Sequence, residues 1–181
     1  MHDRARLFTA VWPDPGVRAR LAAESDGWRW PTSARPLPAA KLHLTLHFIG
    51  AFPRADIDAL AAALAALAPE PTRLTASGRE VWRGGIAVLL FAADAALERL
   101  HAQIGGVVAD VGVALDPRPF AAHVTLARAA RGATLPARPP ALEWNARGFA
   151  LVQSAGGDYR VLRTFGDDPR DDVGARIDPP R

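Results

Sequence analysis

The hydrophobic and polar positions along the chain predict short strands alternating with amphipathic helices. Strands are expected where apolar and β-branched residues cluster between Gly, Pro and Asp, at residues 6–12, 42–49, 73–82, 86–91, 122–128, 148–154 and 159–165. Helices are expected where apolar residues recur at spacings of three and four, after Asp14-Pro15 and at residues 54–68 and 95–111. Gly105-Gly106 is expected to weaken the last helix. The order β-α-β-α-β-β-α-β-β-β indicates an α+β fold.

A four-residue pattern occurs twice, each time on a predicted strand. His43-Leu44-Thr45-Leu46 returns 80 residues later as His123-Val124-Thr125-Leu126, and each copy follows a helix and a proline-containing loop. At average residue usage, one such string is expected in only about one chain of this length in fifty, and two in the same chain are much rarer. We therefore expect two similar lobes whose equivalent strands lie on either side of a central cleft, with the helices outside.

The alternation of side chains along a strand brings the polar residues of each motif together. His43 and Thr45 share one face of the first strand, and His123 and Thr125 share one face of the second. Arg128 follows the second motif and can pair with a phosphate. Strict alternation places it on the face opposite His123, so it reaches the cleft only through a bulge or at the strand end.

Two imidazoles that face one cleft suit the opening of a cyclic phosphate by water. One must take a proton from the attacking water and the other must give one to the leaving oxygen, and histidine is matched to both tasks near neutral pH. The hydroxyls of Thr45 and Thr125 can donate hydrogen bonds to the non-bridging oxygens. This scheme requires no metal and no organic cofactor.

Alternation also assigns the residues that flank the motifs. Leu42 and Phe48 are expected in the core, and His47 is expected on the side of His43, facing solvent. His101 lies on a predicted helix and is expected to take no part. The aromatic residues considered for stacking on a base are Phe8, for which core packing is favoured, and Trp12, Trp30 and Tyr159.

Composition indicates in which compartment such a protein would work. Hydrophobic residues make up 49% of the 181, and the absence of cysteine excludes disulfides and is typical of a reducing compartment. No apolar run approaches the roughly 18 residues that span a bilayer, and the first residues lack the core of a signal peptide, so we expect a soluble, cytoplasmic protein.

Residues 1–165 form one predicted bilobal domain, and the polar residues 166–181 a disordered tail. Outside the tail, 19 basic side chains exceed 14 acidic ones, which suits an RNA partner.

The paired motifs resemble those of the 2H phosphoesterase superfamily, in particular its bacterial and archaeal RNA 2′,3′-cyclic phosphodiesterases, also called 2′-5′ RNA ligases. Further segments resemble the family in order, namely Arg6-Leu7-Phe8, Phe48-Ile49-Gly50, Pro119-Phe120, Ala127-Arg128, Leu151-Val152-Gln153-Ser154 and Tyr159. The resemblance covers residues 4–165. The family often has proline before the second histidine, where this chain has Ala122.

The resemblance implies two antiparallel sheets facing a cleft and the conversion of a terminal 2′,3′-cyclic phosphate, on RNA or a nucleotide, to a 2′-phosphate. It implies that His43 is the proton donor to the leaving 3′ oxygen and His123 the proton acceptor from water, although the residues alone leave the two roles exchangeable. Reversible 2′-5′ ligation would follow from microscopic reversibility. Neither a membrane nor an obligate protein partner is expected.

Two other classes of function fit the same residues. A metal-dependent hydrolase would use His43, His47 and His123 as ligands, but residues four apart on a strand lie about 13 Å apart. A non-catalytic RNA- or phosphate-binding module would use the two motifs only to hold phosphate. Within the enzyme class, RNA ends, cyclic mononucleotides, ADP-ribose cyclic phosphate and 2′-5′-linked oligonucleotides all stay open as substrates.

Overall fold

A computed structural model describes residues 3–166, so the expected tail, apart from Gly166, lies outside the described residues. Within this range the strands are β1 (Arg4–Val11), β2 (Arg35–Pro36), β3 (Leu44–Pro53), β4 (Thr72–Trp82), β5 (Ile86–Ala92), β6 (His123–Arg128), β7 (Glu143–Ala146), β8 (Gly148–Ala155) and β9 (Asp158–Gly166). The helices are α1 (Pro15–Asp26), α2 (Ile57–Ala65) and α3 (Ala95–Asp110), with short 3-10 turns η1 (Ala39–Lys41) and η2 (Arg54–Asp56).

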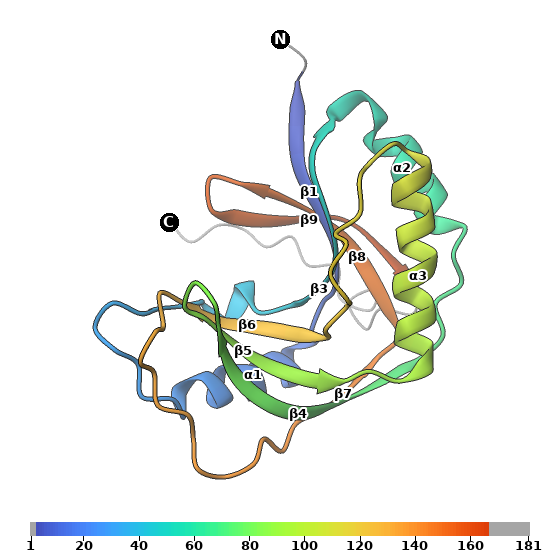
Figure 1. Ribbon diagram of the computed structural model, residues 1–181. Coiled ribbons are helices and arrows are strands. Elements are labelled where there is room, and N and C mark those ends of the chain that lie inside the picture. Colours follow the sequence, from blue (N-terminus) through green and yellow to red (C-terminus); the bar gives the residue numbers. More distant parts are fainter. Residues whose placement is uncertain (1–2, 167–181) are drawn as a thin grey trace.

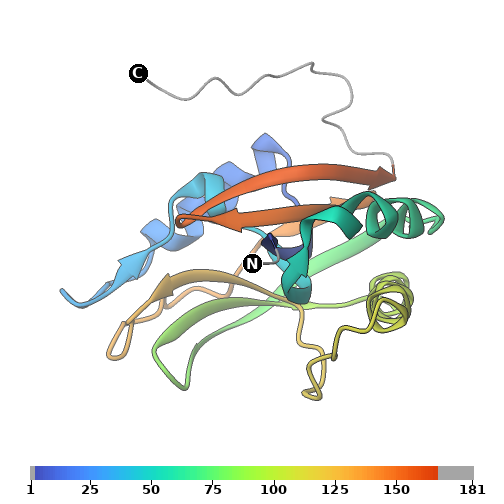
Figure 2. The same cartoon turned by 90° about the horizontal axis from the view of Figure 1, so that it is seen from above.

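The strands form one antiparallel sheet that curls into two facing halves (Figure 1). One half has the order β7-β4-β5-β6 and the other β3-β1-β8-β9, and β2 pairs with β6. The halves meet between β3 and β6 at the single pair Leu44↔Val124. Seen from above, they lie as two layers (Figure 2). The α+β bilobal architecture expected from the sequence is confirmed.

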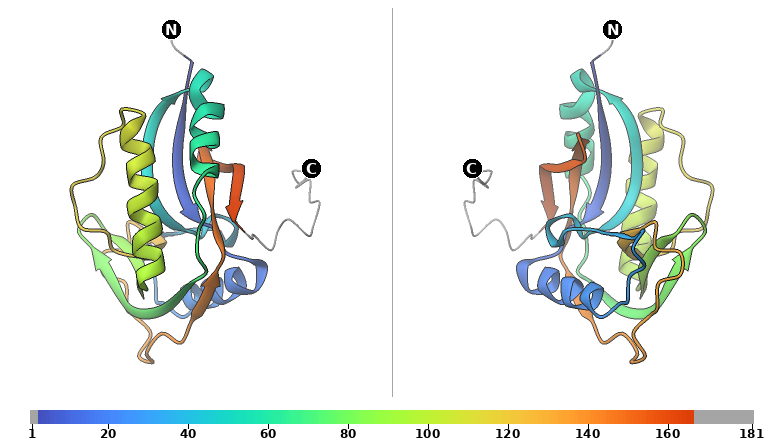
Figure 3. Two further views of the ribbon diagram at one scale, coloured as in Figure 1. Left: turned by 90° about the vertical axis from the view of Figure 1, so that its right-hand side faces the viewer. Right: turned by 90° about the vertical axis from the view of Figure 1, so that its left-hand side faces the viewer.

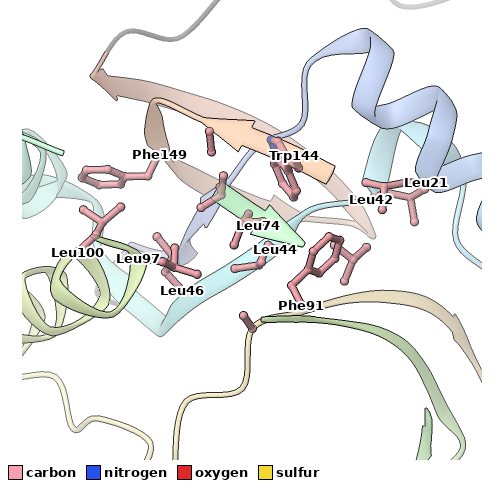
Figure 4. Close-up of a cluster of buried hydrophobic side chains, with 14 of the residues drawn as sticks. Leu21, Leu42, Leu44, Leu46, Leu74, Phe91, Leu97, Leu100, Trp144 and Phe149 are labelled. Carbon is pink, nitrogen blue, oxygen red and sulfur yellow. The ribbon is translucent and has the colours of Figure 1, made fainter. Parts of the chain in front are cut away.

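Helices α2 and α3 stand side by side along one side of the curled sheet (Figure 3). Helix α3 packs against β3 and β4, and α2 packs against β9, so the pair supports both halves. The buried residues of α3 are spaced as a helical stripe, at Leu97, Leu100, Ile104, Gly105 and Val108. They join the main core, where leucines of β3 and β4 meet the rings of Phe91, Trp144 and Phe149 (Figure 4). Among residues 3–166 no helix has the length and apolarity needed to cross a membrane.

Several boundaries differ from the sequence prediction. Helix α3 runs unbroken through Gly105-Gly106, because packing of its apolar stripe outweighs the low helix propensity of glycine. The proline-containing loop expected before the first motif contains the two-residue strand β2. Strand β7 was not expected, because it has only four residues and Glu and Asn are poor strand formers. Its alternate residues Trp144 and Ala146 are nevertheless buried, as in other half-buried strands.

Candidate active site

The contact between β3 and β6 brings the two His-x-Thr motifs together. Its central residues, Leu44 and Val124, pair antiparallel, so the residues on either side of each one come face to face with the other motif. Antiparallel pairing runs one chain against the other and places His43 toward Thr125, with His123 toward Thr45. All four of these side chains line one cavity of about 300 Å³. The predicted convergence of the motifs on a shared cleft is therefore what the structure has.

The two imidazoles are held in the same orientation by the same local contact. Nδ1 of His43 lies 2.7 Å from the carbonyl oxygen of Lys41, and Nδ1 of His123 lies 2.7 Å from the carbonyl oxygen of Ala121. A carbonyl oxygen can only accept, so each Nδ1 carries the hydrogen and each Nε2 is left as the basic nitrogen. Each catalytic candidate is thereby fixed in one tautomer by the residue two positions before it.

Each motif contains a β-bulge at the same position. Thr45 and His47 pair with successive residues of β1, which leaves Leu46 as the extra residue. In β6, Leu126 is the extra residue in the same way. The bulge shifts the following side chains to the other face, and this turns Arg128 into the cavity beside His123 and Thr125. Arg128 thus reaches the cavity through a bulge, which strict alternation had required.

The bulge in β3 overturns the assignments of Phe48 and His47. Phe48, expected in the core, lines the cavity with 66% of its surface exposed. His47, expected beside His43 and facing solvent, is 8% exposed. Its Nε2 donates to the backbone oxygen of His101 in α3 at 2.8 Å. The metal-ligand set of His43, His47 and His123 is therefore wrong, and no other group of three potential ligands occurs in the described part of the chain.

His101, expected to take no part, is the middle ring of a stack that links the two motifs. It lies 4.0 Å from the His47 ring on one side and 4.0 Å from the Phe120 ring on the other, nearly parallel to both. The His101 ring also hydrogen-bonds the backbone of Leu46, the bulged residue. Burial, with a smaller contribution from His47, lowers the pKa of His101 to about 4, so the His101 ring is uncharged at neutral pH. It ties the bulge of β3 to the segment that enters β6.

Aromatic side chains enclose His43. Trp12 stacks on its ring at 5.3 Å, Phe8 lies 4.9 Å away, and Tyr159 meets it edge-on at 5.2 Å. Phe8 belongs to a small apolar cluster on the cleft side of β1 and β8. It is therefore buried, as expected, and it also lines the cavity. Trp30 instead stacks on Trp28, and neither ring lines the cavity.

These surroundings change the pKa values of the two histidines. Burial lowers the pKa of His43 to about 4, against the opposing hydrogen bond to Lys41, and the nearby charges of His123 and Arg128 lower it further. Burial also lowers the pKa of His123, with Arg118 contributing in the same direction. Since a positive charge on one ring disfavours protonation of the other, at most one of the two rings is an imidazolium over most of the pH range.

Sequence reasoning missed several residues of the cavity. The full lining is Arg6, Leu7, Phe8, Leu37, His43, Thr45, Phe48, Gly50, His123, Thr125, Arg128, Ser154 and Tyr159. Arg6 adds a second cation to the cavity besides Arg128, and its alternation with the buried residues Ala5 and Leu7 was a signal that could have found it. Leu37 comes from the loop that pairs with β6, a contact that no local pattern predicts.

Several known proteins are similar to this chain in sequence. Residues 17–158 match the sequence model of the 2′-5′ RNA ligase superfamily. The chain belongs to this superfamily. An RNA 2′,3′-cyclic phosphodiesterase of Thermus thermophilus is 36% identical over 178 residues, covering 88% of this chain and 89% of the relative. A second protein of that name, from Geobacillus stearothermophilus, is 34% identical over 106 residues but is matched over only 33% of its length. These relatives of the superfamily confirm the enzyme class expected from the sequence, a cyclic phosphodiesterase.

Solved structures of the superfamily share the fold. LigT of E. coli in its apo form has a TM-score of 0.80 and 26% identity, covering 91% of this chain and 98% of that one. LigT complexed with 3′-AMP gives a TM-score of 0.80 at 25% identity over the same shares. TT0787 of Thermus thermophilus gives 0.74 at 28% identity, with 89% and 97% covered.

Proposed function

We propose that this protein hydrolyses terminal 2′,3′-cyclic phosphates of RNA to 2′-phosphates by metal-independent acid–base catalysis, with His43 as proton donor and His123 as proton acceptor. The observation that carries the proposal is the matched pair of imidazoles. Both rings line one cavity and have Nδ1 bound to a backbone carbonyl, so both present Nε2 as the reactive nitrogen. The relatives named RNA 2′,3′-cyclic phosphodiesterase support the same reaction.

The proposed reaction is a single displacement at phosphorus. Nε2 of His123 takes a proton from water as the oxygen of that water bonds to phosphorus. The bond from phosphorus to the 3′ oxygen breaks, and this oxygen receives the proton of the His43 imidazolium. The products are a 2′-phosphate monoester and a 3′-hydroxyl. An anionic phosphate in the cavity raises the pKa of a neighbouring imidazole, so His43 takes up the proton that it needs from solvent when the substrate binds.

The remaining polar side chains of the cavity are suited to the charge that develops on the phosphate. The hydroxyls of Thr45 and Thr125 and the guanidinium groups of Arg6 and Arg128 line the same cavity. Donors fixed in place before reaction stabilise the non-bridging oxygens most strongly in the transition state. With a 5′-hydroxyl in place of water as the nucleophile, the same groups would open the cyclic phosphate to form a 2′-5′ phosphodiester, although the excess of water favours hydrolysis. A cytoplasmic location stays a prediction from the composition.

The test is turnover of 2′,3′-cyclic nucleotides and of RNA ending in a cyclic phosphate, in excess chelator, with identification of the product isomer. We expect a 2′-phosphate, and His43→Ala or His123→Ala should each reduce kcat by at least about 10²-fold. Thr45→Ala and Thr125→Ala should reduce it less. Circular dichroism of each variant checks that the fold is kept.

Normal turnover by folded His123→Ala would refute the mechanism. Loss of activity with chelator would refute its independence of metal. If the wild type binds RNA ends but never turns them over, the chain is a phosphate-binding module instead.

A further inference from the structure

A second cavity of about 220 Å³ adjoins the catalytic one. The two share Thr45, Phe48 and His123, so these three side chains form the boundary between them. The second cavity extends from this boundary toward the segment before β6, where Arg118 and Phe120 lie. It is therefore a continuation of the catalytic cleft and not a separate hollow of the surface.

Aromatic rings dominate this second cavity. Phe48, at 66%, is the most exposed large hydrophobic residue of the described chain. Trp82 lies 4.4 Å from the His123 ring, and Phe120 is packed on His101 at 4.0 Å. Every nucleobase has a face that stacks on such rings, so this kind of binding does not depend on the identity of the base. Rings held in place beside a phosphate-binding site are the arrangement by which single-stranded nucleic acid is bound.

A cation accompanies the rings. The Arg118 side chain is 81% exposed, and its Nε lies 2.9 and 3.1 Å from the two carboxylate oxygens of Asp116. Asp116 thus orients the guanidinium and offsets part of its charge. The charge of Arg118 is still felt at the catalytic boundary, where it contributes to the lowered pKa of His123. A backbone phosphate that bridges the two cavities would meet this guanidinium.

We propose that the second cavity binds the nucleotide that precedes the cyclic-phosphate nucleotide in the RNA chain. The proposal rests on the proposed function and specifies its substrate as an oligonucleotide end. A catalytic cavity of about 300 Å³ lies at the small end of ligand sites, so it holds the terminal nucleotide while the rest of the chain must leave it. The adjoining aromatic cavity receives the next base, and Arg118 its phosphate.

The experiment compares two product-like ligands by titration calorimetry: adenosine 2′-phosphate and the dinucleotide ApA with a terminal 2′-phosphate. The dinucleotide should bind the wild type about 5- to 150-fold more tightly, which is the contribution of one base stacked on an aromatic side chain. Phe120→Leu, which keeps an apolar group against His101, should remove most of this advantage. Arg118→Ala should reduce it and lower the slope of log Kd against log salt by about 0.7.

Arg73→Ala is the matched control, because Arg73 is also an exposed arginine paired with a carboxylate, and it lines neither cavity. It should leave the dinucleotide advantage in place. Equal affinity of the wild type for both ligands would overturn the proposal, as would an advantage that survives both variants. Equal weakening of both ligands would assign the cavity to the terminal nucleoside and would also overturn it. Turnover of the cyclic mononucleotide, measured separately, tests the proposed function alone.

Discussion

Replacing each of two neighbouring glycines of α3 by alanine should change the stability of the protein in different ways. In a helix interior, alanine is favoured over glycine by about 0.8–1.0 kcal/mol. A methyl group on Gly106 would meet no atom within 4 Å. Gly106→Ala should therefore raise the free energy of unfolding by about 1 kcal/mol, a rise of roughly 2–4 °C in Tm for a chain of this size.

A methyl group on Gly105 would instead lie 3.2 Å from Cε1 and 3.3 Å from Nε2 of His47. This ring has little freedom to move, because its Nε2 is bound to the His101 oxygen at 2.8 Å and its face is stacked on the His101 ring. Overpacking of this kind costs about 1–3 kcal/mol. The gain in helix propensity offsets only part of that, so Gly105→Ala should be neutral to about 2 kcal/mol destabilising.

The assay is urea unfolding of both variants and the wild type under one set of conditions, together with kcat/KM for a 2′,3′-cyclic nucleotide. Gly105→Ala should also lower kcat/KM, because His47 follows the bulge that turns Phe48 into the cavity. Gly106→Ala should leave kcat/KM at the wild-type value. If Gly105→Ala stabilises the protein as much as Gly106→Ala, the close fit of α3 against His47 does not exist.

Two further predictions concern the cavity itself. The pKa of His43 is about 4 in the folded protein against 6.5 unfolded, so the unfolded state binds more protons between these values. The contribution of this neutral ring to the free energy of unfolding is therefore complete above pH 6.5 and is lost as the pH falls toward 4. From this residue alone, the free energy of unfolding should be about 2 kcal/mol lower at pH 5 than at pH 7. Urea unfolding of His43→Ala at the two pH values should lack that part of the decrease. If His43→Ala shows the same pH dependence as the wild type, the His43 ring is not held neutral by burial. Arg128→Ala should raise KM for cyclic nucleotides about 10- to 150-fold through loss of a charge-assisted hydrogen bond; Arg131→Ala, just beyond the strand and outside the cavity, is the control, and equal effects of the two would exclude a specific role for Arg128.

The sequence predicts the site where side-chain alternation is regular and fails where the chain departs from it. His43, Thr45, His123 and Thr125 lie before the bulges, and the faces assigned to them are correct. Phe48 and His47 lie beyond the extra residue Leu46, so the rule of alternate faces assigns both to the wrong side. A bulge leaves no reliable mark in a single sequence, since Leu46 is as suitable for a regular strand as for a bulge.

Contacts between distant segments account for the other misses. Leu37 reaches the cavity because its segment pairs with β6. His101 becomes the partner of His47 because α3 packs on β3 at a glycine. Such contacts depend on how elements are packed, which periodicity does not contain. The element types and the α+β class, in contrast, follow from periodicity and were predicted well.

The matching bulges of β3 and β6 place Phe48 and Arg128 at equivalent sites, each five residues after its histidine. The backbone there is nearly two-fold symmetric, and the histidines and threonines obey that symmetry. A symmetric frame alone could not tell one ester oxygen of the substrate from the other. Under the proposed mechanism, residues at which the two halves differ must therefore distinguish the two ester oxygens. Phe48 and Arg128, a phenyl ring and a guanidinium at equivalent positions in the cavity, are such a pair.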